Sequence, residues 1–281
     1  MLNVIEVVKK TSEFFASKGI ESARLNAELI VGHALGLARM SLYLNFERPV
    51  SETELAAIRE LVRRRGRREP LQYVVGFTEF SGLRLKTDRR ALIPRPETEL
   101  LVETIGSRCG APPGRVLDLG TGCGAIALAL ARMFPQARVT AVDSSAQALS
   151  LAAENAQSTG LAGRVTLVES SWFERLPAGE TYDLVVSNPP YLSAAEAAAT
   201  APEVREHEPM AALVSGSQGY EHIGRIIEAS PGVLAAGGML ALETGVAHHG
   251  LAAASAQGAG FARTESLQDL TGRDRFFLAW R

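Results

Sequence analysis

The sequence has little of what marks a secreted, membrane-spanning or metal-binding protein. It contains two cysteines, Cys109 and Cys123, and no Cys-x-x-Cys pair, which excludes a disulfide framework. No apolar run approaches the roughly 18 residues that cross a bilayer, and the first residues lack the basic start and apolar block of a secretory signal. The five histidines show no metal-ligand spacing. We therefore expect a cytoplasmic protein with no membrane partner and no metal site.

Charge is nearly balanced over the whole chain but is unevenly distributed along it. Residues 1–90 contain 16 Lys and Arg against 11 Asp and Glu, whereas residues 91–281 contain 13 against 20. Much of the positive excess lies in one basic run, which consists of Arg63, Arg64, Arg65, Arg67 and Arg68. Such a run can contact nucleic acid or an acidic protein, or it can be a solvated helix end beside the negative C-terminal dipole. We favour the solvated helix end, because no aromatic residues alternate with the arginines as they do in stacking platforms.

Two kinds of pattern precede residue 95. Residues 1–73 show apolar residues at helical spacing, with a capping-box pattern from Ser51 to Glu54, and we interpret them as a small helical domain. Residues 74–94 change to a strand-like pattern, in which Val74-Val75 and the segments around the turn at 81–82 predict short strands. We interpret this second part as a β-hairpin linker between two domains.

From residue 95 to residue 281 the pattern alternates between strands and helices. Parallel strands are expected at 115–119, 138–142, 165–169, 182–187 and 238–243. Two further strands, at 261–269 and 275–280, are joined by a glycine turn and predict an antiparallel hairpin at the sheet edge. Alternation of this kind is typical of a doubly wound, mostly parallel α/β sheet. We therefore expect an α/β fold preceded by the helical domain and the hairpin.

A glycine-rich loop follows the first of these strands, and two cofactors compete for it. Gly120, Gly122 and Ala125 fit the looser dinucleotide pattern G-x-G-x-x-A, and Asp143 stands about 20 residues further on, where a ribose-binding acid belongs. Asp118 argues against a dinucleotide, because its carboxylate would repel a pyrophosphate but would suit the ammonium of an amino acid moiety. The pattern D-x-G-x-G-x-G resembles the loop of class I S-adenosylmethionine methyltransferases, which have a Rossmann-like fold.

The most informative motif is Asn188-Pro189-Pro190-Tyr191, at the end of the fourth strand. An amide nitrogen is a poor nucleophile, because its lone pair is delocalised into the carbonyl, so an enzyme must hold it in line with the methyl group. The Asn188 side-chain oxygen can accept one N–H, and a nearby carbonyl such as that of Pro189 can accept the second. The prolines fix the loop, and Tyr191 offers a ring to stack on the planar group. The motif predicts methylation of a planar amide or amino nitrogen.

The chain as a whole resembles the HemK/PrmC family, the protein-(glutamine) methyltransferases of class 1 peptide chain release factors. The resemblance covers nearly the whole length and is carried, in the family's order, by residues 69–73, 93–99, 118–125, 143, 155–156, 172–173, 188–191, 208–209, 269, 272 and 275. It implies methyl transfer from S-adenosylmethionine, with S-adenosylhomocysteine as product, to the glutamine of a Gly-Gly-Gln loop. It also implies that the helical domain helps to recognise the release factor. We expect a monomer that needs no nucleic acid.

Carried over residue by residue, the resemblance assigns three groups of site residues. Cofactor contacts match Asp118, Gly120, Thr121, Gly122, Cys123, Gly124, Asp143, Trp172 and Asn188, and the clamp on the substrate amide matches Asn188, Pro189, Pro190 and Tyr191. Asn188, Pro189 and Tyr191 are the catalytic candidates. Ser171 departs from the family, because many relatives have an acid before the tryptophan. We expect this substitution to weaken recognition of the adenine amino group by about 1 kcal/mol.

Three other activities and a non-enzymatic role remain as alternatives. Methylation of a ribosomal-protein glutamine would use the same clamp, so only the N-terminal domain and linker, which we interpret as the release-factor type, separate it. A DNA methyltransferase acting on the adenine amino group would need a basic groove, whereas residues 91–281 carry excess negative charge that would repel phosphate. A Rossmann dehydrogenase, or a binding module that kept the fold, would have no use for the Asn188 motif.

Overall fold

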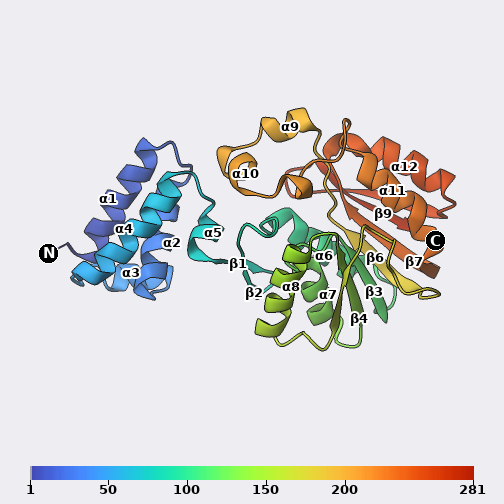
Figure 1. Ribbon diagram of the computed structural model, residues 1–281, viewed down its shortest axis with the longest axis horizontal. Helices are drawn as coiled ribbons and strands as arrows, with labels where there is room; N and C mark the ends of the chain where they lie inside the picture. Colours follow the sequence, from blue (N-terminus) through green and yellow to red (C-terminus); the bar gives the residue numbers. More distant parts are fainter. Residues whose placement is uncertain (1) are drawn as a thin grey trace. The chain divides into compact units, whose positions relative to one another are not determined.

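The computed structural model describes residues 2–281, which divide into two compact units (Figure 1). The first unit is the chain up to Phe77 together with Ala201–His207, and the second is Thr78–Thr200 with Glu208–Arg281. Seven residues from the later half of the chain thus belong to the N-terminal unit. Within residues 2–281, no helix has both the length and the apolar character needed to cross a membrane.

The first unit is helical, as expected. Its helices are α1 (Val4–Ser17), α2 (Ala23–Leu35), α3 (Arg39–Leu44), α4 (Glu52–Gly66), α5 (Leu71–Val75) and α10 (Pro202–His207). The predicted capping box is present at the start of α4, where Ser51 and Glu54 satisfy each other's backbone N–H groups. Apolar residues at helical spacing meet in one core, including Val4, Phe15 and Ile30. Burial of this shared apolar face holds the short helices together.

The basic run at the end of α4 is tied into the first unit rather than solvated. Arg65 is only 6% exposed, and its guanidinium donates to the side chains of Asn26 (2.8 Å) and Glu203 (2.9 Å). Arg68 reaches the other oxygen of Glu203 (2.8 Å), and Arg64 forms a two-pronged pair with Glu69. The expectation of a solvated helix end is therefore wrong for these three residues, because acids outside the run neutralise them.

The connection between the helices and the sheet differs from the prediction at one point. Val74 and Val75 end helix α5 instead of forming a strand. Gly76 caps that helix with φ +84°, and its N–H bonds to the carbonyl of Gln72, so local capping overrides the strand preference of valine. The hairpin itself consists of β1 (Phe77–Phe80) and β2 (Leu83–Lys86). Ser81 and Gly82 both adopt positive φ in its turn.

The second unit is built on one seven-stranded sheet with the order β5-β4-β3-β6-β7-β9-β8. The strands are β3 (Arg115–Leu119), β4 (Arg138–Asp143), β5 (Val165–Glu169), β6 (Tyr182–Ser187), β7 (Leu234–Glu243), β8 (Arg263–Gln268) and β9 (Asp274–Trp280). The first five are parallel, and β9 runs antiparallel to both of its neighbours. The predicted α/β class and the antiparallel C-terminal hairpin are confirmed.

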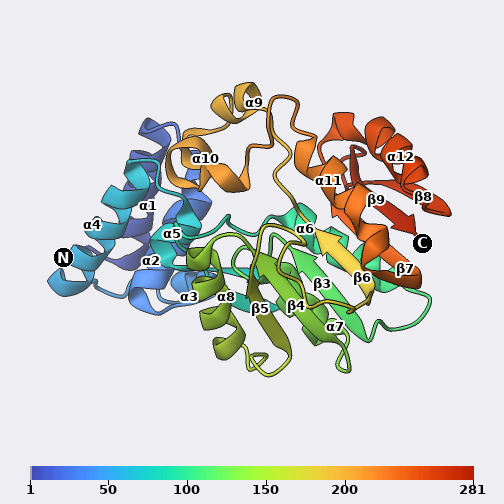
Figure 2. The same ribbon diagram turned by 45° about the vertical axis from the view of Figure 1, so that its right-hand side comes forward.

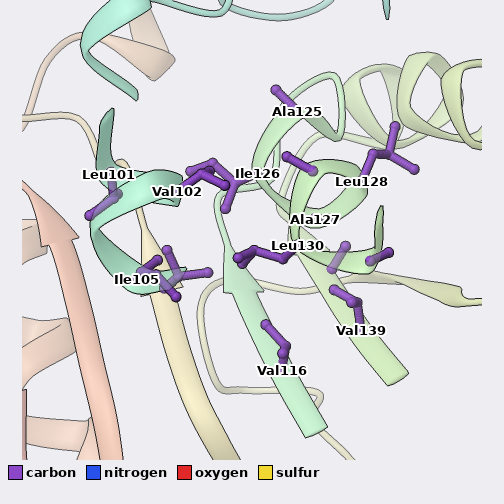
Figure 3. Close-up of a cluster of buried hydrophobic side chains, with 14 of the residues drawn as sticks. Leu101, Val102, Ile105, Val116, Ala125, Ile126, Ala127, Leu128, Leu130 and Val139 are labelled. Carbon is purple, nitrogen blue, oxygen red and sulfur yellow. The ribbon is translucent and has the colours of Figure 1, made fainter. Parts of the chain in front are cut away.

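Helices cover both faces of this sheet (Figures 1 and 2). One face packs against α6 (Pro96–Arg108), α7 (Ala125–Met133) and α8 (Ala146–Ser158) through a buried apolar cluster that includes Ile105, Val116 and Leu130 (Figure 3). The other face packs against α11 (Glu221–Ala229) and α12 (His249–Gly258), where Ile223 and Ala252 are fully buried. Alternate residues of each strand point to opposite faces, so both faces are apolar.

Candidate active site

The register of the sheet brings the ends of four parallel strands to one edge. Leu119 of β3 pairs with Val142 of β4 and with Ser187 of β6, and Ser187 in turn pairs with Leu242 of β7. The residues that come directly after these four, namely Gly120, Asp143, Asn188 and Glu243, therefore lie at the same edge. Ligands of open α/β sheets bind at this carboxyl edge. The fold thus joins the predicted cofactor loop and the predicted amide motif.

The glycine loop is shaped by its backbone. Gly120, Gly122 and Gly124 have φ of +71°, +57° and +86°, a left-handed conformation that a side chain would strain. The N–H groups of Gly120 and Thr121 donate to the carbonyl of Val142 (2.8 and 2.9 Å), which ties the loop to β4. Three left-handed glycines at alternate positions allow a ligand to approach the backbone closely.

Asp118 is completely buried beneath this loop. Its Oδ2 accepts hydrogen bonds from the Thr121 hydroxyl (2.6 Å) and the N–H of Ala127 (3.1 Å), whereas Oδ1 has no hydrogen-bond partner within residues 2–281. Burial, with Asp143 nearby, raises the pKa of Asp118 to about 7. A buried carboxylate oxygen without a donor is what a cationic group would satisfy, so Asp118 fits a ligand that carries an ammonium.

Asp143 closes the other side of the loop, at the end of β4. Its Oδ2 accepts the N–H of Gly122 and its Oδ1 accepts the N–H of Ser145, both at 2.9 Å. Burial raises the pKa of this carboxyl, while the backbone donors favour its charged form. Each carboxylate oxygen has a further lone pair, so Asp143 fits a ligand with neighbouring hydroxyls.

Trp172 lies next to the loop on the same side. A side chain at Gly120 would come within 3.5 Å of its ring, and the ring packs against His222 with centroids 5.2 Å apart. Trp172 itself adopts φ +53°, an uncommon conformation for a bulky residue. Gly120, Asp143 and Trp172 are thus brought together, as the cofactor assignment requires. The weaker adenine recognition expected at Ser171 stays a prediction.

The Asn188 motif is joined to two residues that sequence reasoning missed. The Asn188 side-chain NH₂ donates to the hydroxyl of Thr98 (3.0 Å), and that hydroxyl donates to Oε2 of Glu243 (2.7 Å). The Tyr191 hydroxyl donates to Oε1 of Glu243 (3.2 Å), and the guanidinium of Arg275 lies 5.8 Å from the Tyr191 ring centroid. Burial raises the pKa of Glu243 and of Tyr191. Thr98 lies within residues 93–99, which carry the family resemblance, and Glu243 ends an expected strand, but neither pattern predicts the link.

Other parts of the quoted motifs anchor the site. Glu208 is 5% exposed, pairs with Arg95 (2.6 Å) and accepts the N–H of Ile93 (3.1 Å). The buried Asn155 side chain accepts the N–H of Lys86 (2.7 Å) and donates to the carbonyl of Cys123 (2.9 Å). These side chains fix the segment before α6 and the glycine loop, because they satisfy buried backbone groups there.

The structure also describes the cysteine of the glycine loop and the backbone of the amide motif. Burial raises the pKa of Cys123 to about 12, so its thiol stays protonated and is not a nucleophile. Within residues 2–281, no group of three or more His, Cys, Asp or Glu side chains is arranged to hold a metal ion.

Among the backbone hydrogen bonds of the same residues, none uses the carbonyl of Pro189, which leaves this oxygen able to accept an N–H from a ligand.

Solved structures of methyltransferases share the fold of the second unit. The 16S rRNA methyltransferase RsmC of Thermus thermophilus matches with a TM-score of 0.52 and 21% identity over 73% of this chain and 49% of its own. A methyltransferase of Pyrococcus furiosus matches with a TM-score of 0.52 and 17% identity over 71% of this chain and 88% of its own. At this identity the likeness identifies the fold alone, and it confirms the predicted class I methyltransferase architecture.

Sequence comparisons are more specific. The PrmC N-terminal domain family matches residues 6–76, and the methyltransferase small domain family matches residues 96–207. A release factor glutamine methyltransferase of Geobacter sulfurreducens is 45% identical over 96% of this chain and 94% of its own length. The proteins of the same name from Rhodopirellula baltica and Chlorobaculum tepidum are 41% and 42% identical, each over 97% of this chain and over 94% and 95% of their own lengths. The chain therefore belongs to the release factor glutamine methyltransferase family.

Proposed function

We propose that this protein transfers a methyl group from S-adenosylmethionine to the side-chain amide nitrogen of the glutamine in the Gly-Gly-Gln motif of class 1 peptide chain release factors. The observation that carries the proposal is the joining of Asn188 and the cofactor loop at one sheet edge. The near full-length match to relatives named release factor glutamine methyltransferase supports the substrate. The match to the PrmC N-terminal domain favours a release factor over a ribosomal protein.

The residues of the loop would hold the cofactor. Asp118 would face the ammonium of its amino acid part, Asp143 would accept the ribose hydroxyls at charge-assisted strength, and Trp172 would line the adenosine side. The cofactor supplies a methyl group bonded to a positively charged sulfur. When it binds, the free oxygen of Asp118 gains a cationic partner, which favours the ionised carboxylate.

The residues of the motif would hold the substrate amide. Asn188 Oδ1 accepts one N–H of the glutamine and the Pro189 carbonyl accepts the other, so that the nitrogen faces the methyl group. Held in this way, the nitrogen would receive the methyl group that the cofactor supplies, and the thioether would be the leaving group. The nitrogen becomes acidic only as it gains the methyl group, and its proton then passes to water. The acceptors are fixed before the substrate arrives, because Pro189 and Pro190 restrict the loop.

The N-terminal helical unit would recognise the release factor, and the enzyme would act in the cytoplasm as a monomer without nucleic acid. The test is mass spectrometry of a purified release factor after incubation with this protein and isotope-labelled S-adenosylmethionine. We expect one labelled methyl group on the glutamine of the Gly-Gly-Gln motif, and none on a factor in which that glutamine is replaced by alanine. Label on a ribosomal protein or on DNA, with none on the factor, would overturn the proposal.

A further inference from the structure

A buried line of hydrogen bonds runs from Asn188 into the interior of the second unit. Thr98 of α6 is 4% exposed and Glu243 at the end of β7 is 1% exposed. The Thr98 hydroxyl accepts a hydrogen bond from the Asn188 NH₂ (3.0 Å) and donates its own hydrogen bond to Oε2 of Glu243 (2.7 Å). These three residues come from different elements that only the folded sheet brings together.

Glu243 sets the direction of this line through its ionised form, which the hydrogen bonds from Thr98 and Tyr191 and the charge of Arg275 favour against the burial that raises its pKa. A carboxylate only accepts hydrogen bonds, so the single proton of the Thr98 hydroxyl must point toward Glu243. The lone pairs of Thr98 then face Asn188, which must present its NH₂ end. The bond to Thr98 is the one hydrogen bond described for the Asn188 side chain within residues 2–281. No other contact of that kind chooses between the two ends of this nearly symmetrical amide.

We propose that Glu243, acting through Thr98, is a positioning residue that turns the Asn188 amide so that its oxygen, and not its nitrogen, faces the substrate amide. The inference rests on the proposed function. If Asn188 were turned over, its NH₂ would face the NH₂ of the glutamine, and two donors cannot satisfy each other. An acceptor at this place is what keeps the target nitrogen in line with the methyl group.

The burial of the Glu243 carboxyl is the second reason to assign it a positioning role. Burying a carboxylate is costly unless its oxygens are hydrogen-bonded, and an apolar residue at the end of β7 would avoid that cost. Both oxygens of Glu243 are instead used by the site, one through Thr98 and the other by the Tyr191 hydroxyl. No ion pair to Glu243 is formed within residues 2–281, although the charges of Arg275 and Glu97 act on it from beyond ion-pair distance. Its hydrogen-bond partners are therefore Thr98 and Tyr191 of the candidate site.

The main test replaces the middle of the line. Thr98→Val removes the hydroxyl but keeps the shape, Thr98→Ser keeps the hydroxyl, and Glu243→Gln puts an end that can donate or accept in place of the carboxylate. Thr104→Val is the matched control, because Thr104 lies on the same helix and no side-chain hydrogen bond of it is described. Two quantities are measured for each folded variant: the single-turnover rate of methyl transfer to a release factor, and the affinity for S-adenosylmethionine.

We expect Thr98→Val to slow methyl transfer by roughly 10²-fold, toward the loss caused by removing one preorganised contact, with cofactor affinity little changed. Thr98→Ser should restore most of the rate, Glu243→Gln should lower it, and Thr104→Val should leave it unchanged. A purely structural role would lower stability without this separation of rate from affinity and without rescue by serine. A folded Thr98→Val enzyme that transfers methyl groups at the wild-type rate would overturn the inference.

A second measurement does not depend on activity. In nuclear magnetic resonance spectra, the side-chain NH₂ of Asn188 should exchange slowly with water in the wild type and faster in Thr98→Val, with restored protection in Thr98→Ser. Unchanged exchange of these protons in Thr98→Val would contradict the inference, whatever the substrate proves to be. Failure of the wild type to methylate a release factor would instead contradict the proposed function alone. The two failures are therefore distinguishable.

Discussion

The two halves of the candidate site are built in different ways. The cofactor half is made within a short stretch by backbone groups: Gly120 and Thr121 bond to Val142, and Asp143 receives an N–H from a residue 21 positions away. The amide half depends on side chains that lie 90 and 145 positions apart in the sequence. A loop closed by its own backbone can be recognised as a motif. A line of side chains gathered from distant elements exists only in the fold.

The largest expected effect is in the amide half. Asn188→Ala should lower the rate of methyl transfer by roughly 10²–10³-fold, because one preorganised contact to the target nitrogen is lost, while cofactor affinity is retained. Asn188→Asp keeps an acceptor but adds a charge beside a cationic sulfur. That charge should tighten cofactor binding without restoring the rate.

Single-turnover kinetics and calorimetry on the wild type and both Asn188 variants check this. If Asn188→Ala turns over at a near-normal rate with cofactor bound, the clamp lies elsewhere, and the assignment of Asn188–Pro189–Pro190–Tyr191 must be abandoned. The amide half would then contribute no chemistry of its own.

The next effect is in the cofactor half. Asp143→Ala should weaken S-adenosylmethionine binding by roughly 1.5–3 kcal/mol, or about 10- to 150-fold, because two charge-assisted hydrogen bonds are lost. Asp183→Ala is the matched control, since Asp183 also accepts two backbone N–H groups, those of Gly114 and Arg115, but at the start of β3. Calorimetry that finds equal affinity for the wild type and Asp143→Ala would refute the ribose assignment.

Asp118 should make cofactor binding depend on pH. In the folded, unliganded protein the pKa of the Asp118 carboxyl is about 7, well above the usual value for an aspartate. The carboxyl is therefore largely protonated below that pH. A cationic ligand favours the ionised form, so affinity should rise about tenfold between about pH 5.5 and 7. The same raised pKa means that the unliganded protein loses stability as pH rises through about 7, because the ionised form is disfavoured when buried.

Titration calorimetry across this pH range, with thermal melts of the unliganded protein, measures both trends. Asp118→Asn should flatten the affinity profile, leaving only the slope that Asp143 contributes through its own raised pKa. An equally steep profile in Asp118→Asn would mean that the ammonium is held by another group.

The smallest expected effect concerns Ser171. Ser171→Asp should tighten cofactor binding by about 1 kcal/mol, or roughly fivefold, if an acid at this position accepts the adenine amino group. Ser171→Ala serves as the control for loss of the hydroxyl. If the affinity of Ser171→Asp does not change, the acceptor for the adenine amino group is a backbone group. Backbone groups would then bind the adenine as well as shape the glycine loop.

Most of the sheet was predictable because its strands are apolar runs bounded by turn residues. The expected strand at 238–243 begins earlier, at Leu234, where a register shift opposite Tyr182 hides its start from the apolar pattern. Val74 and Val75 were mistaken for strand residues because a one-turn helix between Pro70 and Gly76 outweighs the β preference of valine. Local preference decides only where capping or packing does not.

The candidate site was predictable in proportion to how locally it is made. Asp118, Gly120 and Asp143 meet as expected because they flank adjacent strands. Thr98 lies in a recognised motif and Glu243 ends a strand, but neither carries a local signal of the link between them, since a threonine or a glutamate has many possible uses. The basic run after residue 62 is conspicuous in the sequence, but its role could not be predicted from it. The acid that neutralises Arg65 and Arg68 is Glu203, which is distant in the sequence.

The seven residues Ala201–His207, which belong to the N-terminal unit, have a consequence for dissecting the chain. A shortened protein that begins at Thr78 would keep this segment but lose Arg65 and Arg68, the two cations that neutralise Glu203. The segment that has lost its ion-pair partners is part of the connection between Tyr191 and Glu208. Removing the residues before Thr78 therefore does not remove the whole of the helical unit. A faithful separation requires replacing Glu203 as well, for example by glutamine, and joining the chain across the segment.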